Sequence, residues 1–152
     1  MKLIRAAGDQ FVFQMGHQEK DLLLEVLQLY PRIPAAYYRL SKASAPDTSS
    51  QQLLDEALVE QRTENRKQLQ QLLADPARLA PHESHWRLSL SGPEVEWLLQ
   101  VLNDIRVGSW IALGSPEERI PALNEETVPH IWAMEMAGSF QVFFLKALEK
   151  ST

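Results

Sequence analysis

The sequence contains no cysteine among its 152 residues. Disulfides, thiolate nucleophiles, cysteine-bound zinc and thiol redox sensing are therefore all excluded. The N-terminal residues also lack the apolar core of a signal peptide. We expect a soluble protein of the cytoplasm, because a chain without cysteine is compatible with that reducing compartment, where disulfides are rare.

Long apolar runs, glycine-rich loops and excess positive charge are missing as well. No apolar run approaches the roughly 18 residues of a membrane-spanning helix, so we expect no membrane insertion. The 6 glycines are scattered singly, which excludes a glycine-rich phosphate loop. The net charge of −5 makes direct nucleic-acid binding unfavourable.

What remains is an ordinary globular composition, with 45% hydrophobic and 23% charged residues. At this length we expect one domain, residues 1–152.

The most informative feature of the sequence is an internal repeat at an offset of 75 residues. The segments 11–27 (FVFQMGHQEKDLLLEVL) and 86–102 (WRLSLSGPEVEWLLQVL) align without a gap. Each reads as a short strand with apolar residues at alternate positions, a polar break, and an amphipathic helix. The repeat predicts two strand–helix units packed as pseudo-symmetric halves of one core.

These patterns predict an α+β fold that is mostly α. We expect about four longer helices, near 17–30, 50–75, 92–113 and 124–150, on one face of a small antiparallel sheet. The sheet should consist of an N-terminal hairpin and strand 86–90, with 86–90 paired to 10–15. Residues 76–84, which include two prolines, are expected to form a connector.

The predicted helix 50–75 has a polar interruption on its apolar face, at Gln61, Arg62 and Asn65. Two interpretations stay open. The middle of the helix either bridges solvent or packs against a polar loop, which the pattern favours, or it meets a partner.

A second polar cluster, Asn103, Asp104 and Arg106, occupies one turn of the most apolar predicted helix. These side chains could line a pocket for a small anionic substrate or form a partner site. The structural interpretation is favoured, with Arg106 binding free backbone carbonyls and Asn103 bridging backbone groups.

Other candidate chemistry is weak. His82 and His85 are three residues apart in a proline-bordered segment, so we expect no metal site. Ser139 and His130 lie on one predicted helix, roughly 13 Å apart at 1.5 Å per residue, so that helix alone forms no triad. We assign no catalytic residue and no cofactor.

The last predicted helix carries apolar residues over more of its circumference than one core-facing stripe needs. We expect Ile131, Met134 and Phe143 to project away from the core and to form a two-fold homodimer interface. The alternative is that this helix is central and covered on both sides by the two repeated helices.

Several motifs together resemble the bacterial domain-of-unknown-function family two-thousand-seventeen, best represented in actinobacteria. They are a Tyr-Arg step, an Arg-Lys step, the Trp-Leu…Leu-Asn-Asp-Leu-Arg helix and the closing helix. In this sequence they correspond to Tyr38-Arg39, Arg66-Lys67, Trp97, Leu98, Leu102, Asn103, Asp104, Ile105, Arg106 and the ending HIW…FFLKALE. The sequence departs from the family at Gly108-Ser109-Trp110, where an apolar run is expected.

The resemblance implies no enzymatic activity and no cofactor. Genes of the family often lie beside that of a Clp protease adaptor, and some members are described as regulators. We therefore expect a non-enzymatic regulatory or adaptor protein that acts through an unidentified protein partner. The alternatives are a transcription-associated regulator and a small enzyme using Asn103, Asp104 and Arg106.

Overall fold

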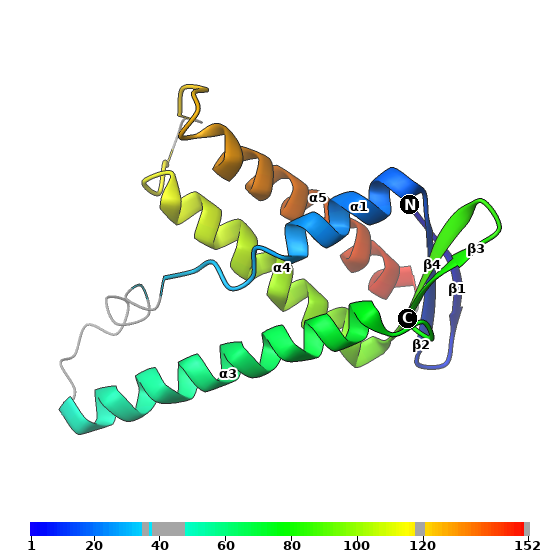
Figure 1. Ribbon diagram of the computed structural model, residues 1–152, viewed down its shortest axis with the longest axis horizontal. Helices are drawn as coiled ribbons and strands as arrows, with labels where there is room; N and C mark the ends of the chain where they lie inside the picture. The colour runs from blue at the N-terminus through cyan, green and yellow to red at the C-terminus, as the bar shows by residue number, and fades with distance from the viewer. Residues whose placement is uncertain (35–36, 38–47, 118–120, 151–152) are drawn as a thin grey trace.

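A computed structural model describes residues 1–34, 37, 48–117 and 121–150. The elements, in chain order, are β1 (Lys2–Ala7), β2 (Gln10–Met15), α1 (His17–Leu27), α3 (Thr48–Ala74), β3 (Leu79–His82), β4 (His85–Ser91), α4 (Gly92–Ala112) and α5 (Val128–Lys150). The predicted α+β, mostly helical fold is confirmed (Figure 1). Tyr38 and Arg39 lie outside the described residues.

The four strands form one antiparallel sheet in the order β1-β2-β4-β3. Its two central strands are the two predicted by the repeat. Phe13 pairs with Leu88, and the same register continues to both sides along β2 and β4. The predicted pairing of 86–90 with 10–15 is therefore confirmed.

The expectation that residues 76–84 form a simple connector is wrong. Leu79–His82 form β3, which pairs with β4 from Leu79 opposite Leu88 to His82 opposite His85. Pro81 lacks the amide that an interior strand needs, but β3 is an edge strand and tolerates it.

The repeat extends beyond the aligned segments to both hairpin turns, and within those segments it includes both helix caps. Gly8 and Glu83, 75 residues apart, both have positive φ, 62° and 56°. Gly16 and Ser91 are the N-caps of α1 and α4, and each backbone amide donates to the glutamate three residues on. Phe13 pairs with Leu88, which is also its equivalent 75 residues later in the repeat. The two antiparallel units are therefore related by a pseudo-twofold axis between β2 and β4.

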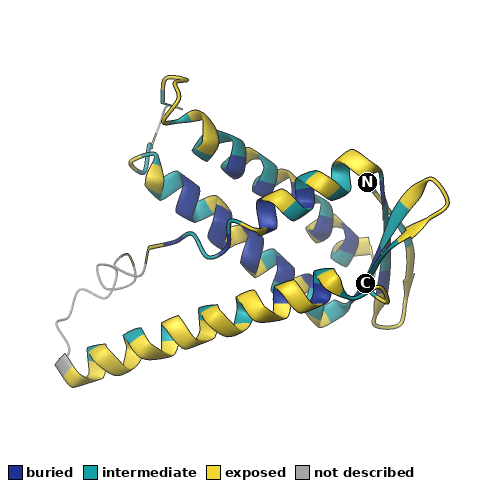
Figure 2. Cartoon of the chain, in the orientation of Figure 1, coloured by how far each residue is buried: buried dark blue, intermediate teal, exposed yellow. Residues whose placement is uncertain are grey.

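The core lies between the inner face of this sheet and α1, α4 and α5, which all lie on that side (Figures 1 and 2). Alternation along β2 and β4 buries every second residue, and α4 and α5 pack side by side against them. The largest fully buried side chains are Phe13, Phe144, Met15, Leu23, Leu27, Leu88, Leu90, Leu102, Ile105, Val26, Val95 and Val101.

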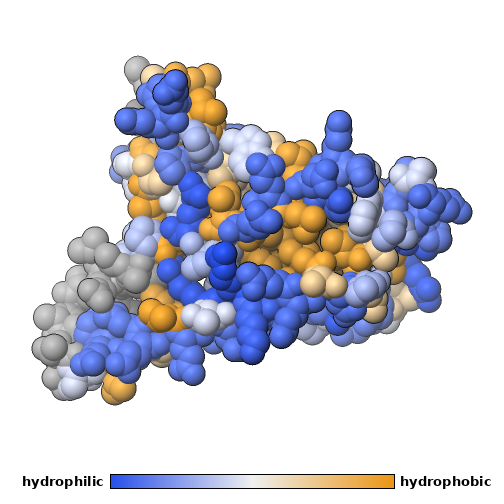
Figure 3. Space-filling view, in the orientation of Figure 1, coloured by the Kyte–Doolittle hydropathy of each residue, from blue (hydrophilic) through white to orange (hydrophobic). Residues whose placement is uncertain are grey.

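Helix α3 differs along its length. Its C-terminal turns bury Leu69 and Leu72, and apolar side chains gather between α1 and α3 (Figure 3), where Leu27 and Leu73 line a small groove. Its N-terminal half extends away from α4 and α5 and is largely exposed (Figure 2). Within the described residues, no helix is both long and apolar enough to cross a membrane.

Candidate functional site

Asp104 is the one site residue that the fold buries, with 8% of its surface exposed. It faces the segment that leaves α1. Its Oδ1 accepts hydrogen bonds from the backbone amides of Arg32, at 2.6 Å, and Ile33, at 3.2 Å. A carboxylate that accepts two backbone amides fixes the position of the segment, because hydrogen bonds to a charged group are the strong ones.

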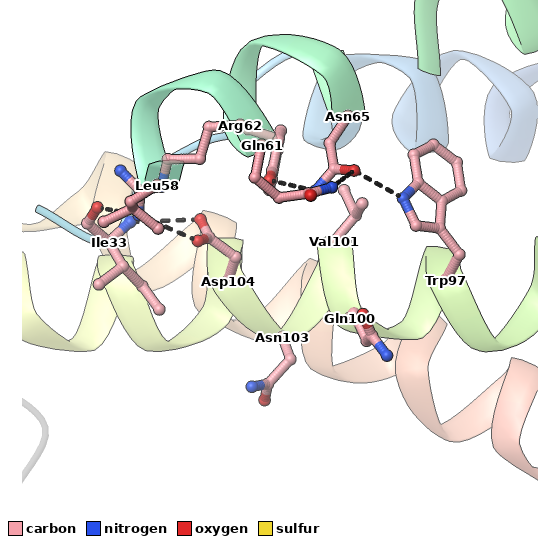
Figure 4. A pocket seen from close by; sticks show the side chains of 11 residues that line it. Ile33, Leu58, Gln61, Arg62, Asn65, Trp97, Gln100, Val101, Asn103 and Asp104 are labelled. Carbon is pink, nitrogen blue, oxygen red and sulfur yellow. Dashed lines mark hydrogen bonds and ion pairs between the residues drawn. The ribbon is translucent and has the colours of Figure 1, made fainter. Parts of the chain in front are cut away.

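Arg62 of α3 completes this contact from the opposite side (Figure 4). Its Nη2 lies 3.4 Å from Oδ2 of Asp104 and donates to the carbonyl of Ile33. Both side chains are mostly buried, at 15% and 11% exposure. We call Asp104 and Arg62, with the backbone of 32–33 between them, the clamp.

Gly108 explains how the segment comes so close to α4. A Cβ built on it would lie 2.5 Å from the carbonyl carbon of Arg32 and 2.7 Å from the nitrogen of Ile33. Real Cβ atoms do not approach backbone that closely, so only glycine permits this crossing. Glycine inside a helix is unfavourable by about 1 kcal/mol relative to alanine. This unfavourable position was the one signal in the sequence that could have located the crossing.

The polar interruption of α3 contacts the same segment and α4. Asn65 donates through Nδ2 to the Tyr30 hydroxyl at 3.0 Å and accepts at Oδ1 from Trp97 Nε1 at 3.3 Å. Arg66 donates to the Tyr30 carbonyl at 2.6 Å. Gln61 donates to Asn65 Oδ1 at 3.0 Å. This stretch therefore packs against the segment after α1 and against α4.

A half-open pocket of about 210 Å³ lies between α3 and α4 beside the clamp. Most of its polar walls are already hydrogen-bonded to one another, including Arg62, Asn65 and Asp104 (Figure 4). The lining residues are Tyr30, Ile33, Leu58, Gln61, Arg62, Asn65, Trp97, Gln100, Val101, Asn103 and Asp104.

The predicted cluster at 103–106 does not converge as a unit, because Asn103 and Asp104 line this pocket and Arg106 does not. Arg106 is exposed and lies outside it, donating to Gln141 of α5 and to Asn103, both at 3.0 Å. In Figure 4 Asn103 points away from Asp104. The expectations that Arg106 binds backbone carbonyls and that Asn103 bridges backbone groups are wrong, because both residues are hydrogen-bonded to side chains. The carbonyl contact belongs to Arg62, which the sequence analysis did not assign to this site.

Arg32 links the clamped segment to the start of α5. Its Nη2 contacts Nδ1 of His130, and its Nε is buried without a hydrogen-bond partner. Burial lowers the pKa of the Arg32 guanidinium. The segment after α1 is thus attached to three helices, α3, α4 and α5.

The expected interface residues of α5 separate into two groups. Phe143 does not project away from the core. It packs edge-on against Phe13, with ring centroids 5.6 Å apart, and lies against the main core. Ile131 and Met134 are half-buried and lie outside that core.

His82 and His85 pair across the turn of the β3–β4 hairpin. Among the described residues, no three histidine, aspartate or glutamate side chains are grouped so that they could hold a metal ion. Comparison of the chain with protein-family models, with curated proteins and with solved structures finds no match.

Proposed function

We propose that this chain is a non-enzymatic regulatory or adaptor protein of the cytoplasm that binds another protein through the N-terminal half of α3. The observation that carries the proposal is the exposure of large apolar side chains there. Leu53 is 67% exposed, Leu54 46% and Val59 59%. Leu53 and Leu54 are adjacent, and Val59 lies on another side of the same projecting helix; exposed apolar side chains of this kind support a protein-binding role.

The clamp supports this role because it holds the helix rigidly from its other half. Arg62, Asn65 and Arg66 are bonded to the 30–33 segment, and Leu69 and Leu72 are buried. A helix that is ordered before binding loses less conformational entropy when a partner's groove closes on it.

The proposal is tested by affinity capture with three forms of the protein. The first is wild type, the second is Leu53→Ser with Leu54→Ser and Val59→Ser, and the third is Leu123→Ser. Leu123 is 74% exposed but lies between α4 and α5, so it serves as the matched control. We expect a protein retained by wild type and by the control to be lost with the α3 variant. If the same proteins are retained by all three forms, the proposal is wrong.

We also propose a two-fold homodimer through the outer side of α5. Val142 and Leu145 are 53% and 50% exposed, and helical spacing places Met134 and Ile131 on the same side. Phe143 packs against the sheet, so it is not part of this proposed interface.

Light scattering at micromolar concentration tests the dimer. We expect twice the monomer mass for wild type and the monomer mass for Val142→Glu with Leu145→Glu. A monomeric wild type would end this part of the proposal.

A further inference from the structure

The outer face of the sheet is the surface opposite to the core. Leu3, Phe13, Leu88 and Leu79 form one cross-strand row, which faces the helices. Successive residues of a strand point to opposite faces. The neighbouring row therefore faces outward, and it consists of Lys2, Gln14, Arg87 and Ala80. No described helix covers this side (Figure 1).

The charge of this face is opposite to that of the chain. Lys2, Arg5 and Arg87 lie on it, and the four strands contain no aspartate or glutamate. The whole chain, by contrast, has 20 acids against 15 lysines and arginines. The carboxylates next to the strands, Asp9 and Glu83, are in the two hairpin turns.

Arg87 lies near the centre of the face. Its Nε is buried without a hydrogen-bond partner, and no ion pair in the described part of the chain involves Lys2, Arg5 or Arg87. Arg78, near the same end of the molecule, is satisfied by Glu94 at 2.6 Å. An arginine without an internal carboxylate retains its capacity for a bidentate bond to one from outside.

We propose that the outer face of the sheet binds an acidic segment of a partner protein through Lys2, Arg5 and Arg87. The inference rests on the proposed function, since it assumes a protein partner, but it concerns a different surface from α3. Lys2 and Arg87 are two strands apart, roughly 10 Å at the usual strand spacing. Carboxylates two to four residues apart in a peptide span similar distances, so one short acidic segment can reach both cations.

A protein segment fits this face better than a nucleic acid does. Phe11, Phe13 and Trp86 are on the inner face, so among the rings of the strands only the imidazoles of His82 and His85, beside one hairpin turn, are left on the outer face for bases to stack on. Three cations can neutralise only a few phosphates of an extended nucleic acid, whereas they suffice for a short acidic segment.

The test uses a fluorescein-labelled deca-glutamate peptide and fluorescence anisotropy at low ionic strength. The sheet variant carries Arg5→Gln and Arg87→Gln. The helix control carries Lys67→Gln and Arg106→Gln, which remove the same charge from exposed sites on helices. We expect saturable binding by wild type and by the helix control, and a dissociation constant at least roughly tenfold weaker for the sheet variant. Absence of saturable binding, or equal weakening in both variants, overturns the proposal.

Two further measurements separate the other occupants and guard against misfolding. Tighter binding of a labelled deoxythymidine decamer than of the peptide would overturn the proposal in favour of nucleic acid. Self-association that only the sheet variant abolishes would overturn it in favour of a second copy of the chain. If Arg87→Gln lowers the melting temperature, the sheet variant is replaced by the double variant Lys2→Gln with Arg5→Gln. Both positions are exposed, and the same outcomes are expected. Loss of peptide binding leaves the capture experiment on α3 unaffected, so the two proposals fail separately.

Discussion

The two repeated units share a hairpin, a turn conformation and a capped helix start, but their helices differ in length. Helix α1 ends after 11 residues, and the chain then leaves as the 28–34 segment. Helix α4 continues for 21 residues, and the additional turns carry Asp104 and Gly108. The segment that leaves the first unit crosses these additional turns of the second. The shared part therefore builds the core, and the unshared part builds the clamp.

The largest effect is expected for a substitution in the clamp, which the two units do not share. Asp104→Ala removes the acceptor of two backbone amides and the carboxylate beside Arg62. We expect the free energy of unfolding to fall by about 3–5 kcal/mol, as for other mostly buried charge pairs that lose one partner. Chemical denaturation measures the loss. Asn103→Ala, a substitution at the exposed residue just before Asp104, is the control and should change the free energy of unfolding little. A loss below about 1 kcal/mol would show that the clamp does not hold the segment.

A second change in the unshared part concerns Gly108. In Gly108→Ala the new Cβ must displace the backbone of Arg32, and we expect a loss of about 1–3 kcal/mol. Gly138→Ala in α5 is the matched control, since its Cβ would lie 3.7 Å from Arg106, an ordinary contact. That variant should gain up to about 1 kcal/mol from helix propensity. Thermal unfolding of the two variants should therefore shift in opposite directions.

The shared turns allow a comparison between the units at one equivalent position. Glu83 has the positive φ that glycine supplies at Gly8. Glu83→Gly should stabilise the protein, and Gly8→Ala should destabilise it, each by about 1 kcal/mol. Glu83→Ala is the control, because it keeps the unfavourable backbone conformation. Equal melting temperatures for Glu83→Gly and Glu83→Ala would contradict the argument.

The smallest expected effect is at Arg106. It is exposed and bonded only to the side chains of Asn103 and Gln141 in the hydrogen bonds described. A charged donor to buried carbonyls, as the sequence predicts for Arg106, would contribute about 1–3 kcal/mol, which Arg106→Ala would remove. The structure lowers this to about 0.5 kcal/mol or less, the usual range for exposed polar pairs. Chemical denaturation of Arg106→Ala and Asp104→Ala measures the difference between their free energies of unfolding. Similar losses in both variants would contradict this prediction.

The strands and the repeat were predictable because their signals are local. Alternation in 11–15 and 86–90 identifies two strands, and the ungapped offset shows that they are equivalent. The clamp was not predictable, because Asp104 binds amides 71 and 72 residues away that carry no side-chain mark in the sequence.

The errors also have physical causes. Pro81 argued against a strand, yet an edge strand does not need the missing amide. The apolar circumference of α5 suggested that Phe143 was outward, but Phe13 extends the core to meet it.

The pseudo-twofold pairing of β2 with β4 has a consequence for the order of folding. Each hairpin and the helix after it involve contacts close in sequence, so both units can form early and independently. The central ladder joins residues about 75 positions apart, from Gln10 opposite Ser91 to Met15 opposite Trp86. Closing a loop of that length costs conformational entropy before the contacts of the ladder can stabilise the protein. This cost slows folding. We therefore expect the docking of two preformed units, with α3 as their tether, to be the rate-limiting step.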